Sequence, residues 1–335
     1  MNIFITLDYE LFFGSKTGTV SKCIIEPTKA LLEIVEPLKI KITCFVDAGY
    51  LYALKRQMGE FNELKEDYDL IKAQLEYLIS RGHRAELHVH PHWEDSFYDK
   101  DLGWVIDASR YKIDDFSEED ILDIFKRYTS EITEITREKP VVYRAGGWCV
   151  QPFSKIAQAL KNEEIFLDST VYPGGYYKSS YQSFNFRKVP QYKTQYKFSS
   201  EVVEVNPNGI FKEIPISSYR LSPLFFWKFV FVKLKKKNVH KAFGDGMAIK
   251  MNKSNILRLL FNFSYSVVSI DGFKASFLEK AFDRYKINTK NKGNFVIIGH
   301  PKAFSFYSLS VTKQFIQKFV EKHQFVTYDL RESLK

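Results

Sequence analysis

The sequence predicts an α/β fold in which a parallel sheet is enclosed by helices, and it favours a barrel over an open sheet. Two observations predict this class. Short apolar runs typical of buried strands alternate with longer stretches of helical periodicity through most of the 335 residues. Seven or eight such strands over this length suit a barrel better, although periodicity alone also permits an open sheet.

The predicted strands are short, apolar and rich in β-branched residues. The first covers residues 2–8, the second covers 39–49 and ends at Gly49, and the third covers 84–90 and ends before Pro91. The remaining predicted strands are 140–146, 165–170, 211–217, 294–300 and 325–330.

Three helices are predicted between the early strands. The first covers about 27–38, where Pro27 suits the first helical turn. The second covers about 66–81 and has the spacing of an amphipathic helix. The third covers about 117–138, where Ser117 is placed as an N-terminal cap.

Composition is that of an ordinary globular protein, 45% hydrophobic and 27% charged, and we predict a single domain over residues 1–335. The three cysteines form no CxxC pair, which argues against a disulfide framework and a zinc knuckle. We see neither a secretory signal nor an apolar run of 18 residues, so we expect a cytoplasmic protein. A net charge of +9 is modest for this length and does not indicate a nucleic-acid partner.

Titratable residues gather at the carboxyl ends of successive predicted strands, where barrel enzymes place their chemistry. Asp8, Arg144, Asp168 and His300 each end a strand. One polar strand end is ordinary because loops begin there, but a series of them favours a functional site.

The segment LHVHPHWED, residues 87–95, places three of the chain's seven histidines within five positions. His88 and His90 share a face of an extended strand, whereas His88 and His92 converge if the chain turns at the intervening proline. Either pair could hold a metal ion, and a catalytic zinc typically takes three protein ligands. The third should come from another strand end, and LDYE at 7–10 offers two carboxylates.

Six short segments of the chain follow one another in a characteristic order. They are ITLDYE (5–10), TCFVDAG (43–49), GHRAELHVHPH (82–92), YRAGGW (143–148), LDST (167–170) and IIGHP (297–301). In this order they resemble the motifs of the polysaccharide deacetylase family, the NodB-like carbohydrate esterases of family 4. The resemblance spans residues 3–301 and implies a distorted (β/α)7-type barrel.

The resemblance implies a role for each matching residue. Asp8 matches the general base, and Arg144 matches the arginine that pairs with that base and orients it. His300 matches the general acid, and Asp168 roughly matches the acid that supports this histidine. The implied ligands of one divalent ion, for which we expect Zn²⁺, are Glu10, His88 and His92.

The sequence departs from the family pattern in three places. Tyr9 stands where most members carry a second acid, so Glu10 is expected to serve as the ligand instead. The third motif reads RAGGW rather than the commoner Arg-Pro-Pro form, and the fourth lacks the usual tryptophan near Asp168. His90 is expected either to line the site, as a neighbour of the ligands or a replacement for one, or to be structural.

These residue types fit amide hydrolysis. A bound divalent metal lowers the pKa of water to about 7, a nearby arginine keeps the carboxylate base ionised, and histidine can protonate the leaving amine. We therefore expect a metal-dependent hydrolase that removes an acetyl or other small acyl group from an N-acylated sugar. Without a secretory signal, it would act in the assembly of surface-polysaccharide or glycolipid precursors, with lipid-linked glycans among the candidate substrates.

Two other functions stay open. One is an amidohydrolase-type metal hydrolase that uses the HxH pair at 88–90, although the absence of histidine between residues 93 and 239 counts against it. The other is a non-catalytic carbohydrate-binding relative that keeps the fold and has lost the metal.

Several aromatic and acidic residues have two possible roles, one in the site and one in the structure. Trp93, Trp148 and His90 are candidate substrate-binding residues, but core packing is the favoured role of both tryptophans. Asp47 fits the site mouth and a loop cap equally well. The segment 222–238, aromatic with a lysine-rich end, is either an outer barrel helix, which we favour, or an interfacial helix in peripheral contact with a membrane.

Overall fold

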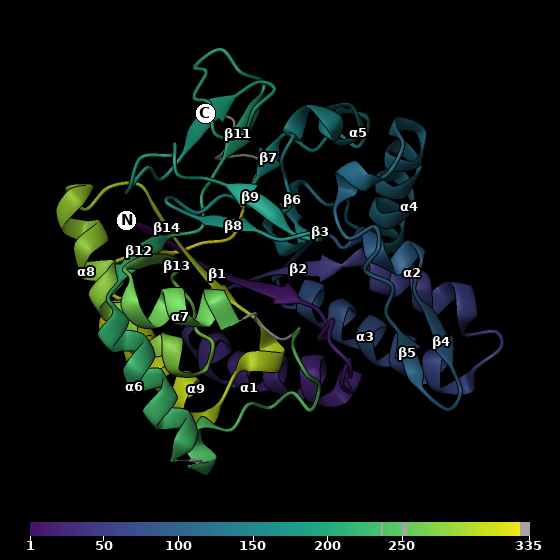
Figure 1. Cartoon of the computed structure of the whole chain (residues 1–335), viewed down its shortest axis with the longest axis horizontal. Helices are drawn as coiled ribbons and strands as arrows, with labels where there is room; N and C mark the ends of the chain where they lie inside the picture. Colours follow the sequence, from purple (N-terminus) through teal and green to yellow (C-terminus); the bar gives the residue numbers. More distant parts are fainter. Residues whose placement is uncertain (236, 250–252, 329–335) are drawn as a thin grey trace.

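The computed structural model describes residues 1–235, 237–249 and 253–328. Within these residues, nine strands form the main sheet in the order β10-β11-β7-β6-β3-β2-β1-β14, and β15 also pairs with β1 (Figure 1). Every neighbouring pair is parallel except β10 with β11. The predicted α/β class is confirmed, with a sheet that is mixed rather than wholly parallel.

Each predicted strand has a counterpart in this sheet, usually a shorter one. The counterparts are β1 (Asn2–Tyr9), β2 (Thr43–Asp47), β3 (Arg84–Val89), β6 (Val142–Ala145), β7 (Leu167–Asp168), β11 (Phe211–Glu213), β14 (Asn294–Gly299) and β15 (Gln324–Phe325). The sheet also contains β10 (Tyr196–Phe198), which was not predicted. The predicted strand 325–330 extends to residues 329 and 330, which lie outside the described part of the chain.

The predicted helices form, and their caps act as the sequence indicates. They are α1 (Glu26–Val35), α3 (Asn62–Ser80) and α4 (Glu118–Thr136), and the side chain of Ser117 accepts a hydrogen bond from the amide of Asp120 at the start of α4. The sequence reading missed α2 (Ala48–Gln57). Gly49 looked like a strand terminator, but it lies in the first turn of a helix capped by Asp47, whose carboxylate accepts from the amide of Tyr50.

The remaining elements are short. The other helices are α5 (Ala157–Asn162), α6 (Pro223–Leu234), α7 (Lys253–Phe261), α8 (Leu278–Asn288) and α9 (Phe306–Phe319). Outside the main sheet, antiparallel pairs form between β4 (Phe97–Asp99) and β5 (Gly103–Val105), β8 (Tyr176–Lys178) and β9 (Ser183–Asn185), and β12 (Ser218–Leu221) and β13 (Ser264–Val267).

The sheet curls toward a barrel, and irregular backbone bridges the gap between β11 and β14. After β11, the amide of Ile216 donates to the carbonyl of Val171 at 2.8 Å, and that of Ser217 donates to the carbonyl of Val296 at 3.0 Å. On the far side of Ser217, the amide of Val268 donates to the Ser217 carbonyl at 2.7 Å. The enclosure is therefore a distorted barrel, closed on one side by hydrogen bonds that join irregular segments to each other and to β14.

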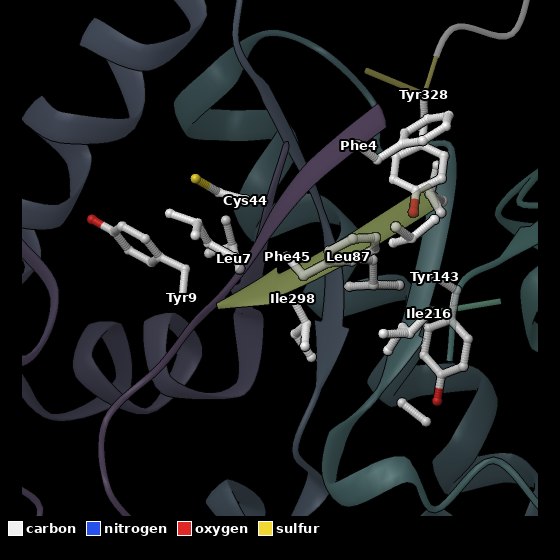
Figure 2. Close-up of a cluster of buried hydrophobic side chains, with 14 of the residues drawn as sticks. Phe4, Leu7, Tyr9, Cys44, Phe45, Leu87, Tyr143, Ile216, Ile298 and Tyr328 are labelled. Atoms are coloured by element: carbon white, nitrogen blue, oxygen red, sulfur yellow. The ribbon is translucent and has the colours of Figure 1, made fainter. Parts of the chain in front are cut away.

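Alternation along the strands separates two environments. In Figure 2, Leu7 and Tyr9 of β1 project to one side, and Phe4 projects to the other, toward Tyr328. The Tyr9 hydroxyl bonds to Gln74 of α3 at 2.8 Å, so odd-numbered residues of β1 face the outer helices. Even-numbered residues face the inside of the curl, where the rings of Phe4 and Phe45 lie 4.7 and 5.9 Å from that of Tyr328.

A pair of buried carboxyl groups joins β7 to β11. Asp168 and Glu213 are register partners on the two strands, and both side chains are buried. Burial raises the pKa of both groups, and the neighbouring Asp168 pushes that of Glu213 well above its usual range. The raised pKa values favour a proton on this pair.

This pair gives a prediction about pH and stability. Because the folded-state pKa of Glu213 is raised, its contribution to stability is lost as pH rises from the unfolded value of about 4.3 toward the folded value. Glu213→Gln keeps a donor for Asp168 and removes that loss. We would measure urea unfolding of both proteins across a pH series. The free energy of unfolding of the variant minus that of the parent protein should increase as pH rises. A difference that stays constant with pH would show that Glu213 is ionised in the folded protein.

Candidate metal centre and proton-transfer groups

A buried ion pair organises the carboxyl ends of the central strands. Asp8 on β1 and Arg144 on β6 are both buried, and Nη1 of Arg144 lies 2.6 Å from Oδ1 of Asp8. The same nitrogen donates to Thr6 at 3.1 Å, and Nε donates to the Ser169 carbonyl at 2.8 Å. The guanidinium also lies over the ring of Phe45, 3.8 Å from its centroid. Asp8 is thus fixed in place, and its Oδ2 atom is left for other groups.

His88 on β3 presents one ring nitrogen to this site. Its Nδ1 lies 2.9 Å from the backbone carbonyl of Arg144, which can only accept a hydrogen bond, so Nδ1 carries a proton. In the neutral ring, the lone pair is then on Nε2, which lies 3.9 Å from Oδ2 of Asp8 and 3.3 Å from Oε2 of Glu10. This is the arrangement by which proteins orient a metal-binding imidazole.

His90 completes a compact ligand group. One ligand atom from each of Glu10, His88 and His90 lies within 4.8 Å of the others, and all three residues are buried. Nε2 of His90 lies 2.7 Å from Oε2 of Glu10, yet neither atom has a hydrogen-bond partner of acceptable geometry. Buried polar atoms that converge without pairing to each other suit a cation placed between them.

His92 does not join this group, although the sequence pattern placed it among the ligands. The chain turns after His90 into a short helix, Pro91–Glu94, and the His92 ring stacks on Tyr111 with 5.5 Å between centroids. Burial holds the pKa of His92 well below its usual value, so the ring is neutral. The group therefore pairs His88 with its neighbour on the same strand face, His90, rather than with His92.

Glycine at position 146 makes room for His90. A β-carbon there would lie 2.6 Å from Nδ1 of His90 and 2.5 Å from the Val89 carbonyl oxygen. The motif RAGGW, which departs from the family pattern, thus allows the His90 ring to lie beside the ligand group.

Lys302, which the sequence analysis did not single out, is buried beside Glu10. Its ammonium donates to Oε1 of Glu10 at 3.0 Å and to the carbonyl of Leu11. Burial alone would raise the pKa of Glu10, but Lys302 and His90 outweigh it and hold that pKa well below the usual range. Glu10 is therefore a carboxylate with one oxygen bound to Lys302 and the other turned toward His88 and His90.

His300 lies beside both Asp8 and Glu10. Its Nε2 is 3.6 Å from Oδ2 of Asp8, and its Nδ1 is 2.8 Å from Oδ2 of Asp271. Burial alone would lower the pKa of His300, but Asp271 and Asp8 outweigh it and raise that pKa. His300 therefore tends to hold a proton, as a general acid must.

Asp271 takes the supporting role that the sequence analysis gave to Asp168. Asp168 accepts from Thr170 at 2.6 Å and lies beside Glu213 on the β7–β11 side of the sheet, whereas Asp271 accepts from both the ring and the amide of His300. The sequence offered one cue, since Asp271 follows the apolar run 267–270, but that segment was not recognised as part of the enclosure.

The two candidate tryptophans differ in exposure. Trp93 is fully buried among Tyr50 and Trp104, and its indole donates to Asp47 at 2.7 Å, so the core-packing role fits it. The same bond and its cap of α2 make Asp47 the loop-capping acid. Trp148 is half-buried against Tyr172 and Phe184, and its part in sugar binding stays a prediction.

These groups together can carry out a hydrolysis. Asp8 is an anchored carboxylate that can accept a proton, and His300 is positioned to donate one. Beside them lies a carboxylate–imidazole group of the type that binds Zn²⁺ and related divalent ions. Ligands, base and acid come from the carboxyl ends of β1, β3 and β14, and Arg144 on β6 ties the base to the sheet.

No family model and no curated protein matches the sequence. Among solved structures, the chain is similar to the PuuE allantoinase, with 10% identity, a TM-score of 0.48, and coverage of 98% of this chain and 88% of the other. It is similar to a polysaccharide deacetylase from Bacillus cereus, with 11% identity, a TM-score of 0.42, and coverage of 99% and 93%. It is also similar to 4-α-glucanotransferase from Thermococcus litoralis, with 14% identity, a TM-score of 0.48, and coverage of 100% and 38%. At these identities the similarity concerns the arrangement of the chain alone.

Proposed function

We propose that this protein is a metal-dependent hydrolase that removes an acetyl or other small acyl group from an N-acylated sugar. The observation that supports it is the placement of Asp8 and His300, which contact each other, directly beside the Glu10–His88–His90 group. Such a layout offers a base, an acid and a cation site within one buried cluster. A role in the assembly of surface-polysaccharide or glycolipid precursors belongs to the same proposal.

The residues divide the reaction between them. A divalent ion held by Glu10, His88 and His90 would supply a nucleophile at neutral pH and polarise the acyl carbonyl. Asp8 accepts the proton of the attacking water as its oxygen bonds to the carbonyl carbon. His300 then donates its proton to the amide nitrogen as the carbon–nitrogen bond breaks, so that a carboxylic acid and the free amine leave. Asp271 holds the His300 ring in the orientation that this donation requires.

The ligand set is tested by counting bound metal. We expect one divalent ion per chain in the parent protein, and its loss in His88→Ala and in His90→Ala, because each substitution removes one of three ligands. His92→Ala should keep the ion, because the His92 ring stacks on Tyr111 and is not one of the three proposed ligands. Elemental analysis of the three purified variants decides between the two imidazole pairs. Metal retained in His90→Ala and lost from His92→Ala would restore the ligand set deduced from the sequence.

Lys302 should matter for metal affinity without being a ligand. Its ammonium fixes one oxygen of Glu10, and loss of such a supporting group typically weakens metal binding about 10- to 100-fold. Lys302→Met, which has a similar length and no charge, should therefore lower the affinity measured by competition with a chelating dye. Tighter binding in this variant would mean that repulsion between the ammonium and the metal ion dominates instead.

The two proton-transfer roles separate with two substrates. Asp8→Asn and His300→Ala should both keep the metal and lose about 10² to 10⁴ in rate on an N-acetylated sugar. On an aryl acetate, whose phenolate leaves without protonation, the defect of His300→Ala should shrink while that of Asp8→Asn remains. Equal defects on amide and ester in both variants would contradict this division of roles.

Two alternative functions make different predictions in the same assays. A non-catalytic carbohydrate-binding protein would release no acetate from any substrate, with or without metal. In favour of an amidohydrolase-type site, the ligand group contains both histidines of the HxH pair, His88 and His90. However, in the described part of the chain the ligand group contains no histidine from a later strand.

A further inference from the structure

An exposed apolar surface lies on the helices that follow β12. We define the α6–α7 surface by the exposed side chains of α6, of α7 and of the adjoining start of β13. On α6, Leu224, Phe231 and Leu234 are 70%, 60% and 69% exposed. The other large apolar members are Trp227, Val230, Ile256, Leu257, Phe261, Phe263 and Tyr265.

The helix α6 is not an ordinary outer helix of the barrel. Among its twelve residues only Phe225 is buried, where it packs on Phe273 and Phe277. Its other partner is α7, because the indole of Trp227 donates to the carbonyl of Leu260 at 3.1 Å. A barrel helix would bury one whole apolar face on the sheet. α6 instead leaves its apolar stripe in solvent, which is typical of an interaction site.

Positive charge is concentrated in the same segment. Residues 221–265 contain nine lysine and arginine residues and a single acidic residue, Asp245, so they carry eight of the nine net positive charges of the whole chain. Asp245 is itself occupied, because it accepts from the amide and hydroxyl of Thr19 at 2.8 and 3.2 Å. The partner must therefore accept aromatic and aliphatic side chains and also be negatively charged.

These features point to an anionic bilayer rather than to a second copy of the chain. A symmetric dimer would place the same patch against itself, and lysines on both copies would repel one another. The helix α6 has 12 residues, which makes it about 18 Å long, too short for a hydrocarbon core of about 30 Å. No helix in the described ranges meets the length and hydropathy needed to cross a membrane. Contact with lipid would therefore be parallel to the membrane surface.

The segment that joins α6 to α7 lies against the backbone of Lys302, beside the candidate metal centre. In the segment between the two helices, the amide of Phe243 donates to the carbonyl of Phe304 at 2.9 Å, and that of Gly244 donates to the carbonyl of Lys302 at 3.0 Å. Lys302 is the residue whose ammonium binds Glu10. A β-carbon on Gly244 would lie 2.6 Å from the Lys302 carbonyl oxygen, so glycine is required for this close approach.

We propose that the α6–α7 surface docks the protein on an anionic lipid bilayer, with the apolar side chains inserted among the lipids and the lysines at the headgroups. Docking there brings the candidate metal centre close to the membrane surface, where the sugar of a lipid-anchored substrate would lie. The docking does not depend on the proposed deacylation, because it is measured by binding and needs no turnover.

Co-sedimentation with vesicles tests the proposal. The full-length protein should sediment with vesicles of phosphatidylcholine containing phosphatidylglycerol, and much less with pure phosphatidylcholine. Raising the salt from about 0.1 to about 1 M shortens the Debye length from about 10 to about 3 Å and should release much of the bound protein. Phe231→Ser with Leu234→Ser, and separately Lys235→Glu with Lys237→Glu, should each lower the partition coefficient about tenfold or more.

Matched controls come from the opposite side of the molecule. The β4–β5 hairpin lies far from α6 and α7 (Figure 1), and it carries Leu102, which is 78% exposed, and the exposed Lys100. Leu102→Ser and Lys100→Glu should bind vesicles like the parent protein. Equal loss of binding in these controls would show that general charge and hydrophobicity, rather than the α6–α7 surface, cause the binding.

The fluorescence of Trp227 provides a second readout of binding, measured on the parent protein itself. Trp93 is fully buried, and Trp104 and Trp148 are half-buried, so Trp227 is the exposed indole of the four. Its emission should shift to the blue on anionic vesicles, and the shift should vanish in Trp227→Phe. Recovery in the supernatant under all lipid conditions would overturn the proposal. So would a dimer by light scattering that Phe231→Ser with Leu234→Ser dissociates, because the surface would then be covered by a second copy.

Discussion

The buried ion pair between Arg144 and Asp8 is the constraint on which the rest of the site depends. It connects β6 to β1 across the inside of the curled sheet, and Arg144 extends the connection to Ser169 after β7. Removing one partner of such a pair leaves an uncompensated buried charge, at a cost of about 3–5 kcal/mol. The pair therefore holds the sheet's curl and the base's position together. The carbonyl of Arg144 also fixes the proton on His88.

The inside of the curled sheet has an apolar end and a charged end. Phe4 and Tyr328 fill it toward the amino end of β1, and Asp8, Glu10 and the histidines occupy the carboxyl ends. Phe45 lies between the two, level with Asp8 and in contact with Tyr328 and Arg144. Such a concentration of buried charge is tolerated because each group has a partner of opposite sign. Lys302 binds Glu10, Arg144 binds Asp8, and Asp271 binds His300. Among these groups, Oε2 of Glu10 and the ring nitrogens of His90 and His92 have no hydrogen-bond partner in the described part of the chain. Oε2 of Glu10 and Nε2 of His90 face each other at 2.7 Å, and a cation would satisfy both.

Local patterns in the sequence predicted the groups that sit at regular strand ends. Asp8, His88, Arg144 and His300 were found because parallel strands bring their carboxyl ends together and each residue directly ends a strand. The choice between His90 and His92 could not be made this way, because it depends on how the chain turns at Pro91 and on the space left by Gly146. Asp271 was missed because it follows irregular backbone at the closure of the barrel, which has no strand periodicity. Lys302 was missed because a lysine after HP reads as surface until its burial is known. α2 was missed because a glycine in the first turn of a helix resembles the end of a strand.

The central claim is that Glu10, His88 and His90 hold one divalent ion beside Asp8. X-ray absorption spectroscopy on the protein loaded with one equivalent of Zn²⁺ tests it most directly, because the method counts imidazole ligands around the ion. We expect two imidazole nitrogens at about 2.0–2.1 Å and carboxylate oxygen at about 2.0–2.2 Å. In the His90→Ala protein this protein-bound shell should be lost, and replacing His92 should leave both imidazoles in place. A spectrum with fewer than two imidazoles in the parent protein, or one that changes with His92 and not with His90, would contradict the account.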